Sequence, residues 1–92
     1  MKFYYVYVLQ SKNQNFIYVG YTTDLQERFR LHNKGQVKST KKFSPFKLIF
    51  YEAYRNKKDA KRREKYFKTT KGKTALRTML KEYLAERKAC FG

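Results

Sequence analysis

The sequence is short of several residue types: among 92 residues it has one cysteine, one proline, no tryptophan and 7 acidic residues. A single cysteine, Cys90, cannot form a disulfide within the chain, which favours a reducing compartment. No apolar run approaches the length that spans a bilayer, and residues 1–6 lack the features of a signal peptide. We therefore expect a cytoplasmic protein that does not enter a membrane.

Positive charge is abundant. Lysine and arginine number 23 against 7 acidic residues, which gives a formal net charge of +16. Such a charge concentrates polyanions around the protein, so DNA or RNA is the expected partner. An anionic membrane surface is the competing partner, but it requires a basic amphipathic helix with a bulky apolar face, which this chain shows only weakly.

Hydrophobic residues make up 41% of the chain and aromatic residues 18%, enough for one modest core. We expect a single domain over residues 1–92 and assume a monomer. Residues 3–9, 16–21 and 46–54 are rich in aromatic and β-branched side chains, which predicts three strands. The first two are expected to pair as an antiparallel hairpin.

Three helices are expected around these strands. Residues 23–26 (TDLQ) fit a capping box, which predicts a helix over residues 24–34 that ends before Gly35. Asn56 is a second N-cap candidate, for a helix that runs to about residue 68 and is broken over residues 69–72. The order β-β-α-β-α-α predicts an α/β fold in which helices cover a sheet. The apolar stripe of the final helix is expected to contain Leu76, Met79, Leu80, Tyr83 and Leu84.

Two polar side chains share the apolar face of the first expected helix. At 100° per residue, Arg28 and His32 fall in one arc with Leu25, Phe29 and Leu31, which must face the sheet. Buried polar groups need partners. His32 alone favours a structural role, bonded to a tyrosine or a backbone carbonyl, whereas Arg28 points more strongly to function.

Glu64 makes a similar case on the second helix. Ala60, Glu64 and Phe67 follow the spacing i, i+4, i+7, so the glutamate faces the core while its basic neighbours face water. The alternative is an internal ion pair with Arg28 or Arg63.

Tyrosines in the expected hairpin add a weaker signal, since tyrosine is favoured in strands whatever the function. Tyr7 and Tyr18 lie on neighbouring strands, so their hydroxyls are expected to meet. The tyrosines at positions 4, 5, 51 and 54 are expected to be core residues.

These residues, in this order, resemble the GIY-YIG nuclease family over nearly the whole chain. Residues 5–7 (YVY) and 18–20 (YVG) match its two tripeptides across a ten-residue spacer. Arg28 and His32 match its helix segment, and residues 60–64 match its glutamate segment. The chain most resembles small stand-alone bacterial members, related to the N-terminal nuclease domain of the nucleotide-excision-repair endonuclease.

The resemblance implies a central three-stranded antiparallel sheet flanked by helices and a metal-dependent endonuclease centre. Tyr7 would act on the attacking water as general base or through an intermediary, and nearby cations such as Arg28 or a lysine would favour its phenolate form. Tyr18 would orient the nucleophile and phosphate, Arg28 would stabilise the phosphate charge, and His32 would assist proton transfer. Glu64 would hold Mg²⁺ or Mn²⁺. Many members also carry a closing asparagine, which this chain lacks after Asn56.

The expected function is cleavage of DNA phosphodiester bonds, with a role in DNA repair. The cleavage is expected to be selective for DNA structure or unpaired regions and not for sequence. A non-enzymatic module that binds DNA or RNA is the first alternative, and a basic domain for an acidic protein is the second. Basic residues expected to contact phosphates are Lys38, Lys41, Lys42, Lys61, Arg62, Lys65, Lys68 and Lys71.

Overall fold

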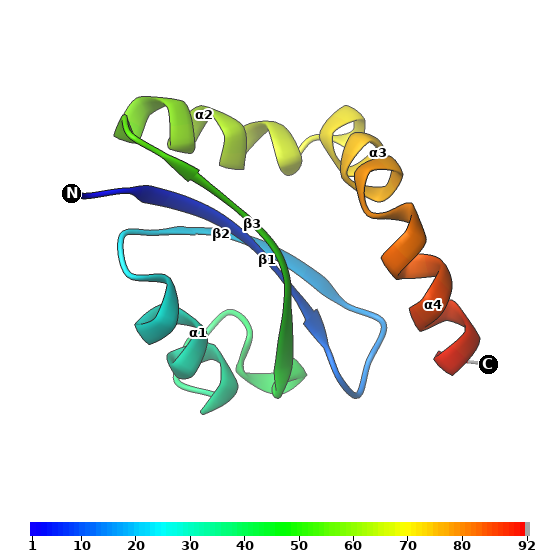
Figure 1. The fold of residues 1–92 in the computed structure, drawn as a ribbon. Helices are drawn as coiled ribbons and strands as arrows, with labels where there is room; N and C mark the ends of the chain where they lie inside the picture. The colour runs from blue at the N-terminus through cyan, green and yellow to red at the C-terminus, as the bar shows by residue number, and fades with distance from the viewer. Residues whose placement is uncertain (92) are drawn as a thin grey trace.

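The sheet has three antiparallel strands in the order β2-β1-β3 (Figure 1). The computed structural model describes the backbone of residues 1–91 and the side chains of residues 1–86, so the expectation for Cys90 lies outside the described side chains. The strands are β1 (Tyr4–Ser11), β2 (Ile17–Thr22) and β3 (Phe46–Tyr54). They confirm the expected antiparallel sheet, and the bounds of β3 match the expected range.

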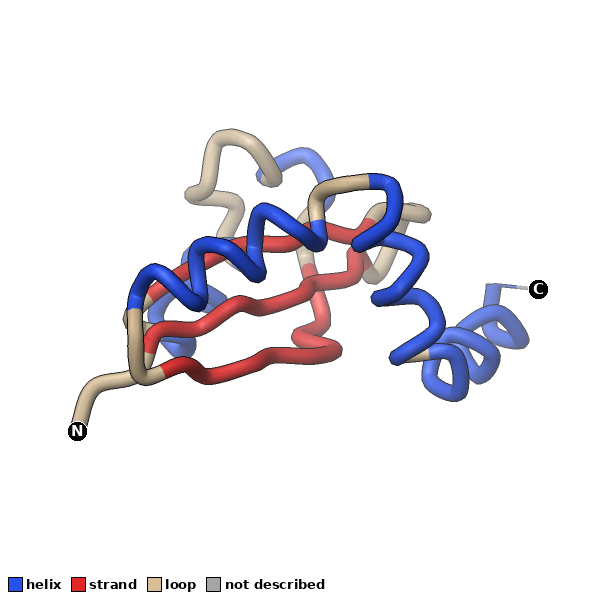
Figure 2. Tube along the Cα trace, turned by 90° about the horizontal axis from the view of Figure 1, so that it is seen from above, coloured by secondary structure: helices blue, strands red, loops and turns tan. Residues whose placement is uncertain are grey.

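Helices cover both faces of this sheet (Figures 1 and 2). Helix α1 (Leu25–Asn33) lies on one face, and α2 (Lys57–Phe67) runs along the strands on the other. A short 3-10 helix η1 (Lys41–Phe43) precedes β3, and α3 (Thr70–Met79) and α4 (Lys81–Phe91) follow α2. The expected order holds, except that the final helix is divided in two at Leu80.

The central strand β1 is buried on both faces because each face carries its own apolar cluster. On the α2 side, Val6 and Val8 pack with Ala60 and Phe67. On the α1 side, Tyr7 belongs to a second cluster. Alternation along β1 therefore directs Tyr7 toward α1.

Side-chain caps begin the helices. The Asn56 side chain accepts a hydrogen bond from the Lys58 backbone N–H, as expected. The Asp24 side chain accepts from Glu27 N–H, so Asp24, and not Thr23, is the N-cap of α1. The expected capping box was therefore one residue too early, while the helix itself matches within a residue at each end.

The break after α2 comes at Lys68 and Thr69, and Gly72 lies inside α3 instead of ending a helix. A Cβ on Gly72 would overlap the Tyr66 carbonyl oxygen, so this glycine permits α3 to pack tightly against the end of α2. The bend at Leu80 leaves Met79 45% exposed, so its assignment to the apolar stripe was wrong.

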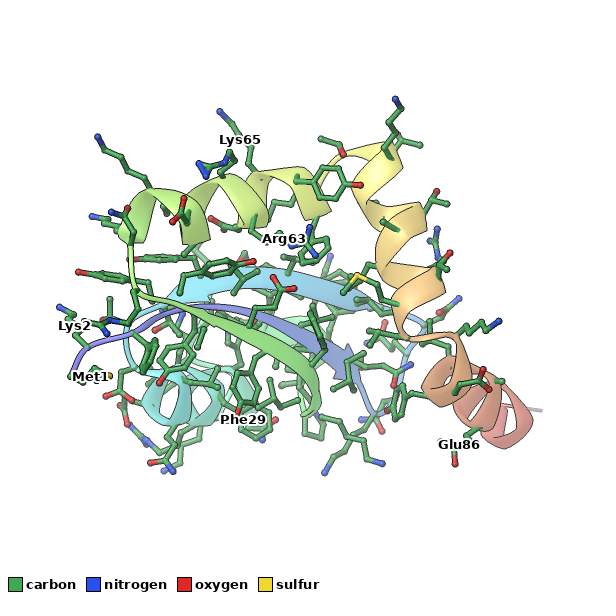
Figure 3. All side chains as sticks on the ribbon, turned by 45° about the horizontal axis from the view of Figure 1, so that its top comes forward. Met1, Lys2, Phe29, Arg63, Lys65 and Glu86 are labelled. Atoms are coloured by element: carbon green, nitrogen blue, oxygen red, sulfur yellow. The ribbon has the colours of Figure 1, made fainter. Side chains whose placement is uncertain are left out.

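Basic side chains of α2 mostly face water. Figure 3 shows Lys65 projecting away from the sheet, whereas Arg63 lies between α2 and the sheet, where it pairs with Glu52. Tyr51 is 53% exposed, so the expectation that it is a core residue was wrong. Within the described part of the chain, the helices are too short or too polar to cross a membrane.

Candidate active site

Tyr7 reaches across β2 because its partner in the pairing register is Gly20. A Cβ on Gly20 would overlap the hydroxyl and the adjacent ring carbon of Tyr7. The phenol ring therefore lies directly over the glycine, in space that any other side chain would occupy. This close approach brings the Tyr7 hydroxyl from the central strand to the β2 edge of the sheet.

The Tyr7 hydroxyl meets His32, which is fully buried on α1. The Tyr7 oxygen lies 2.8 Å from His32 Nε2, and His32 Nδ1 lies 2.7 Å from Thr40 Oγ1. The Thr40 hydroxyl lies 3.5 Å from the Val37 carbonyl, to which it can donate, and we assign the tautomer in which Nδ1–H donates to the Thr40 oxygen. In this tautomer Nε2 carries no proton and accepts from the Tyr7 O–H.

The electrostatics of His32 keep its ring neutral. The pKa of His32 is lowered to about 4, mainly by burial and to a smaller extent by the positive charge of Arg28. The imidazole is therefore neutral at pH 7 and acts as a hydrogen-bond acceptor.

Tyr7 keeps its proton. Burial raises the pKa of Tyr7 to about 12, and the nearby Arg28 guanidinium opposes this rise without overcoming it. Arg28 thus acts in the expected direction, toward the phenolate form of Tyr7, but its effect is too weak to produce that form. Desolvation of a phenolate in this buried position outweighs the attraction of one partly solvated cation.

Tyr18 and Arg28 lie beside this pair. The Tyr18 ring centroid is 6.2 Å from that of Tyr7 and 5.2 Å from that of His32. Arg28 lies one turn before His32 and is partly exposed. Among the described side chains it forms no ion pair, so its charge is available to an incoming anion.

Glu64 reaches the same edge from the other face of the sheet. Its side chain is 17% exposed, and its charge contributes to the raised pKa of Tyr7. Its carboxylate oxygens lie 3.6 Å from Lys61 Nζ and 3.2 Å from Lys68 Nζ. Lys68 Nζ in turn lies 5.6 Å from the Tyr18 ring centroid. Glu64 is thus ion-paired, but with lysines instead of the arginines considered from sequence.

The family model of the GIY-YIG catalytic domain matches residues 3–78. This range contains the five expected site residues Tyr7, Tyr18, Arg28, His32 and Glu64. The chain belongs to the GIY-YIG family. Membership of this nuclease family indicates an endonuclease that acts on nucleic acid.

Small bacterial proteins are among its relatives. The UPF0213 protein CPE1444 of Clostridium perfringens is 40% identical over 70% of this chain and 69% of its own length. The UPF0213 protein spr1390 of Streptococcus pneumoniae is 36% identical over 89% of this chain and 78% of its own. These names state no activity.

A solved structure shares the fold. The solution NMR structure of the UPF0213 protein BH0048 from Bacillus halodurans has a TM-score of 0.52 and 34% identity, covering 86% of this chain and 85% of that protein.

The GIY-YIG site offers one carboxylate for a metal. Among the described residues, no three histidine, cysteine or acidic side chains gather to form a metal cluster. Mg²⁺ commonly takes one or two carboxylates together with waters and substrate phosphates. Glu64 therefore fits a cation that binds jointly with a phosphate.

The residues expected to contact phosphates fall into two groups. Those of the α2–α3 side are exposed, and Arg62 there pairs with Asp59. The second group lies between α1 and β3, in the segment that also holds Thr40. The first group contains Lys61, Arg62, Lys65, Lys68 and Lys71, and the second Lys38, Lys41 and Lys42.

Thr40 is the site residue that sequence reasoning missed. It is fully buried and fixes the His32 ring, yet in the sequence it is one polar residue in a lysine-bearing loop. The Thr69 hydroxyl, at the break after α2, donates to the Tyr66 carbonyl and accepts from the Gly72 N–H as the cap of α3.

Gly20→Ala should displace the Tyr7 ring and lower the free energy of unfolding by about 1–3 kcal/mol, the usual cost of overpacking. Urea unfolding of the variant measures this. The matched control is the same change in a Tyr7→Leu background, where the added methyl has room and should cost less than about 0.5 kcal/mol. Equal losses in both backgrounds would contradict the proposed contact between Gly20 and Tyr7.

The stability should also depend on pH through His32, the single histidine of the chain. Its folded pKa of about 4 lies below its usual 6.5. The unfolded chain therefore binds a proton first as the pH falls, and the folded state loses stability below pH 6.5. Between pH 7.5 and 5 the wild type should lose about 2 kcal/mol more than His32→Gln. Parallel pH dependence of the two unfolding free energies would show that the folded imidazole titrates normally.

Proposed function

We propose that this GIY-YIG protein is a cytoplasmic, divalent-metal-dependent endonuclease that hydrolyses DNA phosphodiester bonds, with Mg²⁺ or Mn²⁺ as cofactor. The observation that supports it best is the meeting, at the edge strand β2, of the Tyr7–His32 pair with Arg28 and Glu64. Each supplies a different requirement of phosphodiester hydrolysis: a proton path, a cation for the phosphate and a carboxylate for the metal.

Arg28 is suited to hold the scissile phosphate. Its guanidinium lies beside the Tyr7 hydroxyl, and it has no acidic partner among the described residues. A guanidinium binds phosphate oxygens through paired N–H groups and stabilises the negative charge that develops on them. Tyr18, next to both Tyr7 and His32, would help to orient the phosphate and the attacking water.

Glu64 would hold the metal ion through its carboxylate. When bound, such an ion polarises the phosphate and stabilises the leaving oxygen. In the metal-free protein the carboxylate pairs with Lys61 and Lys68. Both lysines must release it for a cation to bind, and they are then available for neighbouring phosphates.

The Tyr7–His32 hydrogen bond supplies a path for the proton of the attacking water. Because the pKa of Tyr7 is about 12, its oxygen accepts that proton as its own proton passes to His32 Nε2. The resulting hydroxide bonds to phosphorus, and the bond to the leaving oxygen breaks; that oxygen takes a proton from solvent.

Substrate binding favours this transfer. In the resting site the Arg28 charge opposes an imidazolium at His32. A phosphate bound to Arg28 compensates this charge and makes His32 a better proton acceptor. The base is therefore effective mainly when the substrate is in place.

The exposed lysines support selectivity for DNA structure over sequence, since phosphate contacts position a nucleic acid without reading its bases. The resemblance to the excision-repair nuclease domain supports a role in DNA repair.

Glu64→Gln should lower metal-dependent cleavage by about 10³-fold or more, the several kcal/mol expected of a metal ligand. Binding of DNA should be kept or become tighter, because Lys61 and Lys68 lose their counter-charge. The measurement is a nicking assay on single-stranded, duplex, flapped and branched DNA with Mg²⁺, Mn²⁺ or EDTA, beside a binding titration.

Glu27→Gln is the matched control, because Glu27 pairs with Arg30 on the exposed side of α1 and undergoes the same change of charge. It should cleave like the wild type. Wild-type protein that binds every substrate and cleaves none would instead favour the non-enzymatic DNA- or RNA-binding module.

A further inference from the structure

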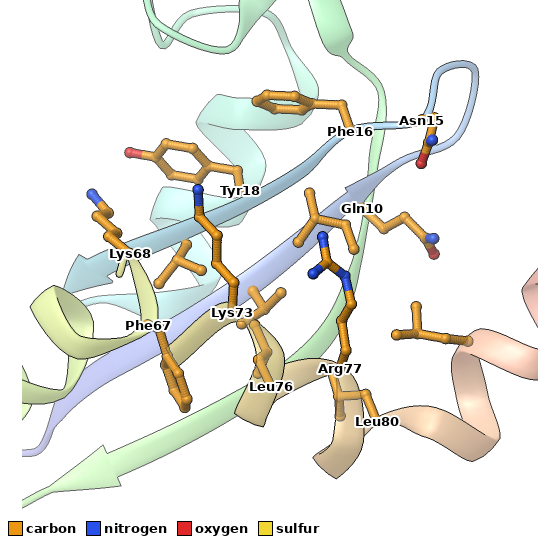
Figure 4. Close-up of a pocket in the computed structure, with 14 residues that line it drawn as sticks. Gln10, Asn15, Phe16, Tyr18, Phe67, Lys68, Lys73, Leu76, Arg77 and Leu80 are labelled. Carbon is orange, nitrogen blue, oxygen red and sulfur yellow. The ribbon is translucent and has the colours of Figure 1, made fainter. Parts of the chain in front are cut away.

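A groove of about 750 Å³ lies between β2 and the helices α3 and α4 (Figure 4). In this view Phe16 and Tyr18 lie on the β2 side, and Lys73, Leu76, Arg77 and Leu80 come from α3 and its C-cap. β2 is an edge strand of the sheet, so this groove is open along the side that carries the candidate active site.

The β2 side of the groove is aromatic and apolar. Phe16 stacks face to face on Phe43, with ring centroids 3.8 Å apart and an interplanar angle of 8°. Ile17 is 36% exposed at the start of β2. Phe43 covers one face of Phe16, so the groove-lining part of that ring and the exposed carbon of Ile17 are the apolar surface that a nucleobase can contact, whatever its sequence.

The α3 side is cationic. Lys73 and Arg77 are spaced i, i+4 on α3, and both line the groove with Lys68. Among the described residues that line the groove, none is acidic. In the part of the chain with described side chains, neither Lys73 nor Arg77 forms an ion pair. This charge favours an anionic occupant.

The groove continues into the candidate active site. Tyr18 and Lys68 line the groove, and both also belong to the site, where Lys68 contacts Glu64 and Tyr18 lies beside His32. A polymer whose phosphate is held at Arg28 therefore has an adjoining channel of apolar surface and positive charge.

We propose that this groove binds an unpaired strand of the nucleic acid that is held at the active site, with bases against Phe16 and Ile17 and phosphates on Lys73 and Arg77. A base in a duplex has both faces covered by its neighbours, so a single-stranded segment matches such a surface. The inference rests on the proposed function and specifies the class of substrate: DNA with a single-stranded segment next to the cut phosphate.

The test measures binding in EDTA, where no cleavage occurs, with fluorescent single-stranded and duplex oligonucleotides. The strands carry 2-aminopurine, whose emission changes on stacking, at successive positions. Lys73→Glu with Arg77→Glu should weaken single-strand binding about tenfold or more and reduce its salt dependence. Ile17→Ser should reduce the 2-aminopurine response and keep the salt dependence. Duplex binding should change less in both variants.

Lys57→Glu with Lys58→Glu is the matched control, since it makes the same change of charge at the start of α2, and neither lysine lines the groove. Equal weakening by the control and by the α3 pair would overturn the inference. Equal losses of affinity for duplex and for single-stranded DNA in the α3 variant would also overturn it. A change in the sedimentation of the free α3 variant would overturn it too, because the groove would then be an interface between copies of the protein.

Failure of the inference and failure of the proposed function give different results. If the wild type cleaves nothing but the α3 variant loses single-strand binding, the groove proposal stands and the nuclease proposal fails. If the wild type cleaves and the α3 variant behaves like the control, the nuclease proposal stands and the groove proposal fails.

Discussion

The hydrogen bond between the Tyr7 hydroxyl and His32 Nε2 is the contact on which the site depends. It forms because Gly20 leaves the space that the Tyr7 ring crosses, and because Thr40 fixes the opposite nitrogen of His32. The bond joins the central strand to α1, while burial keeps the phenol protonated and the imidazole neutral. The two buried groups thus satisfy each other, and in the proposed mechanism they would carry a proton away from the attacking water.

Charge is distributed around this neutral pair in a way that suits a polyanionic substrate. Arg28 approaches from α1 and Glu64 from α2, on opposite faces of the sheet, and the edge strand β2 is where groups from the two faces meet. Lys61 and Lys68 pair with Glu64, and under the proposed function a cation on Glu64 would free them to contact phosphates. The groove lies along the same edge, so the proposed cleavage site and the proposed strand-binding surface adjoin each other.

The features that followed from sequence are those set by local chemistry and periodicity. The bounds of β3, the cap at Asn56 and the inward faces of His32 and Glu64 come from alternation, capping and helical spacing. What sequence did not supply depends on contacts between distant segments. Thr40 reaches His32 only through the folded loop, Gly72 is needed only where two helices touch, and the raised pKa of Tyr7 comes from its burial.

The most direct measurement of the central claim is a crystal structure with a non-cleavable single-stranded DNA analogue and Mn²⁺, located by its anomalous scattering. The account predicts Mn²⁺ on the Glu64 carboxylate, with Lys61 and Lys68 turned away from it. It also predicts a phosphate between the metal and Arg28, and the Tyr7 hydroxyl directed at a metal-side water. Bound DNA with no Mn²⁺ at Glu64, and with both lysine ion pairs intact, would contradict the account.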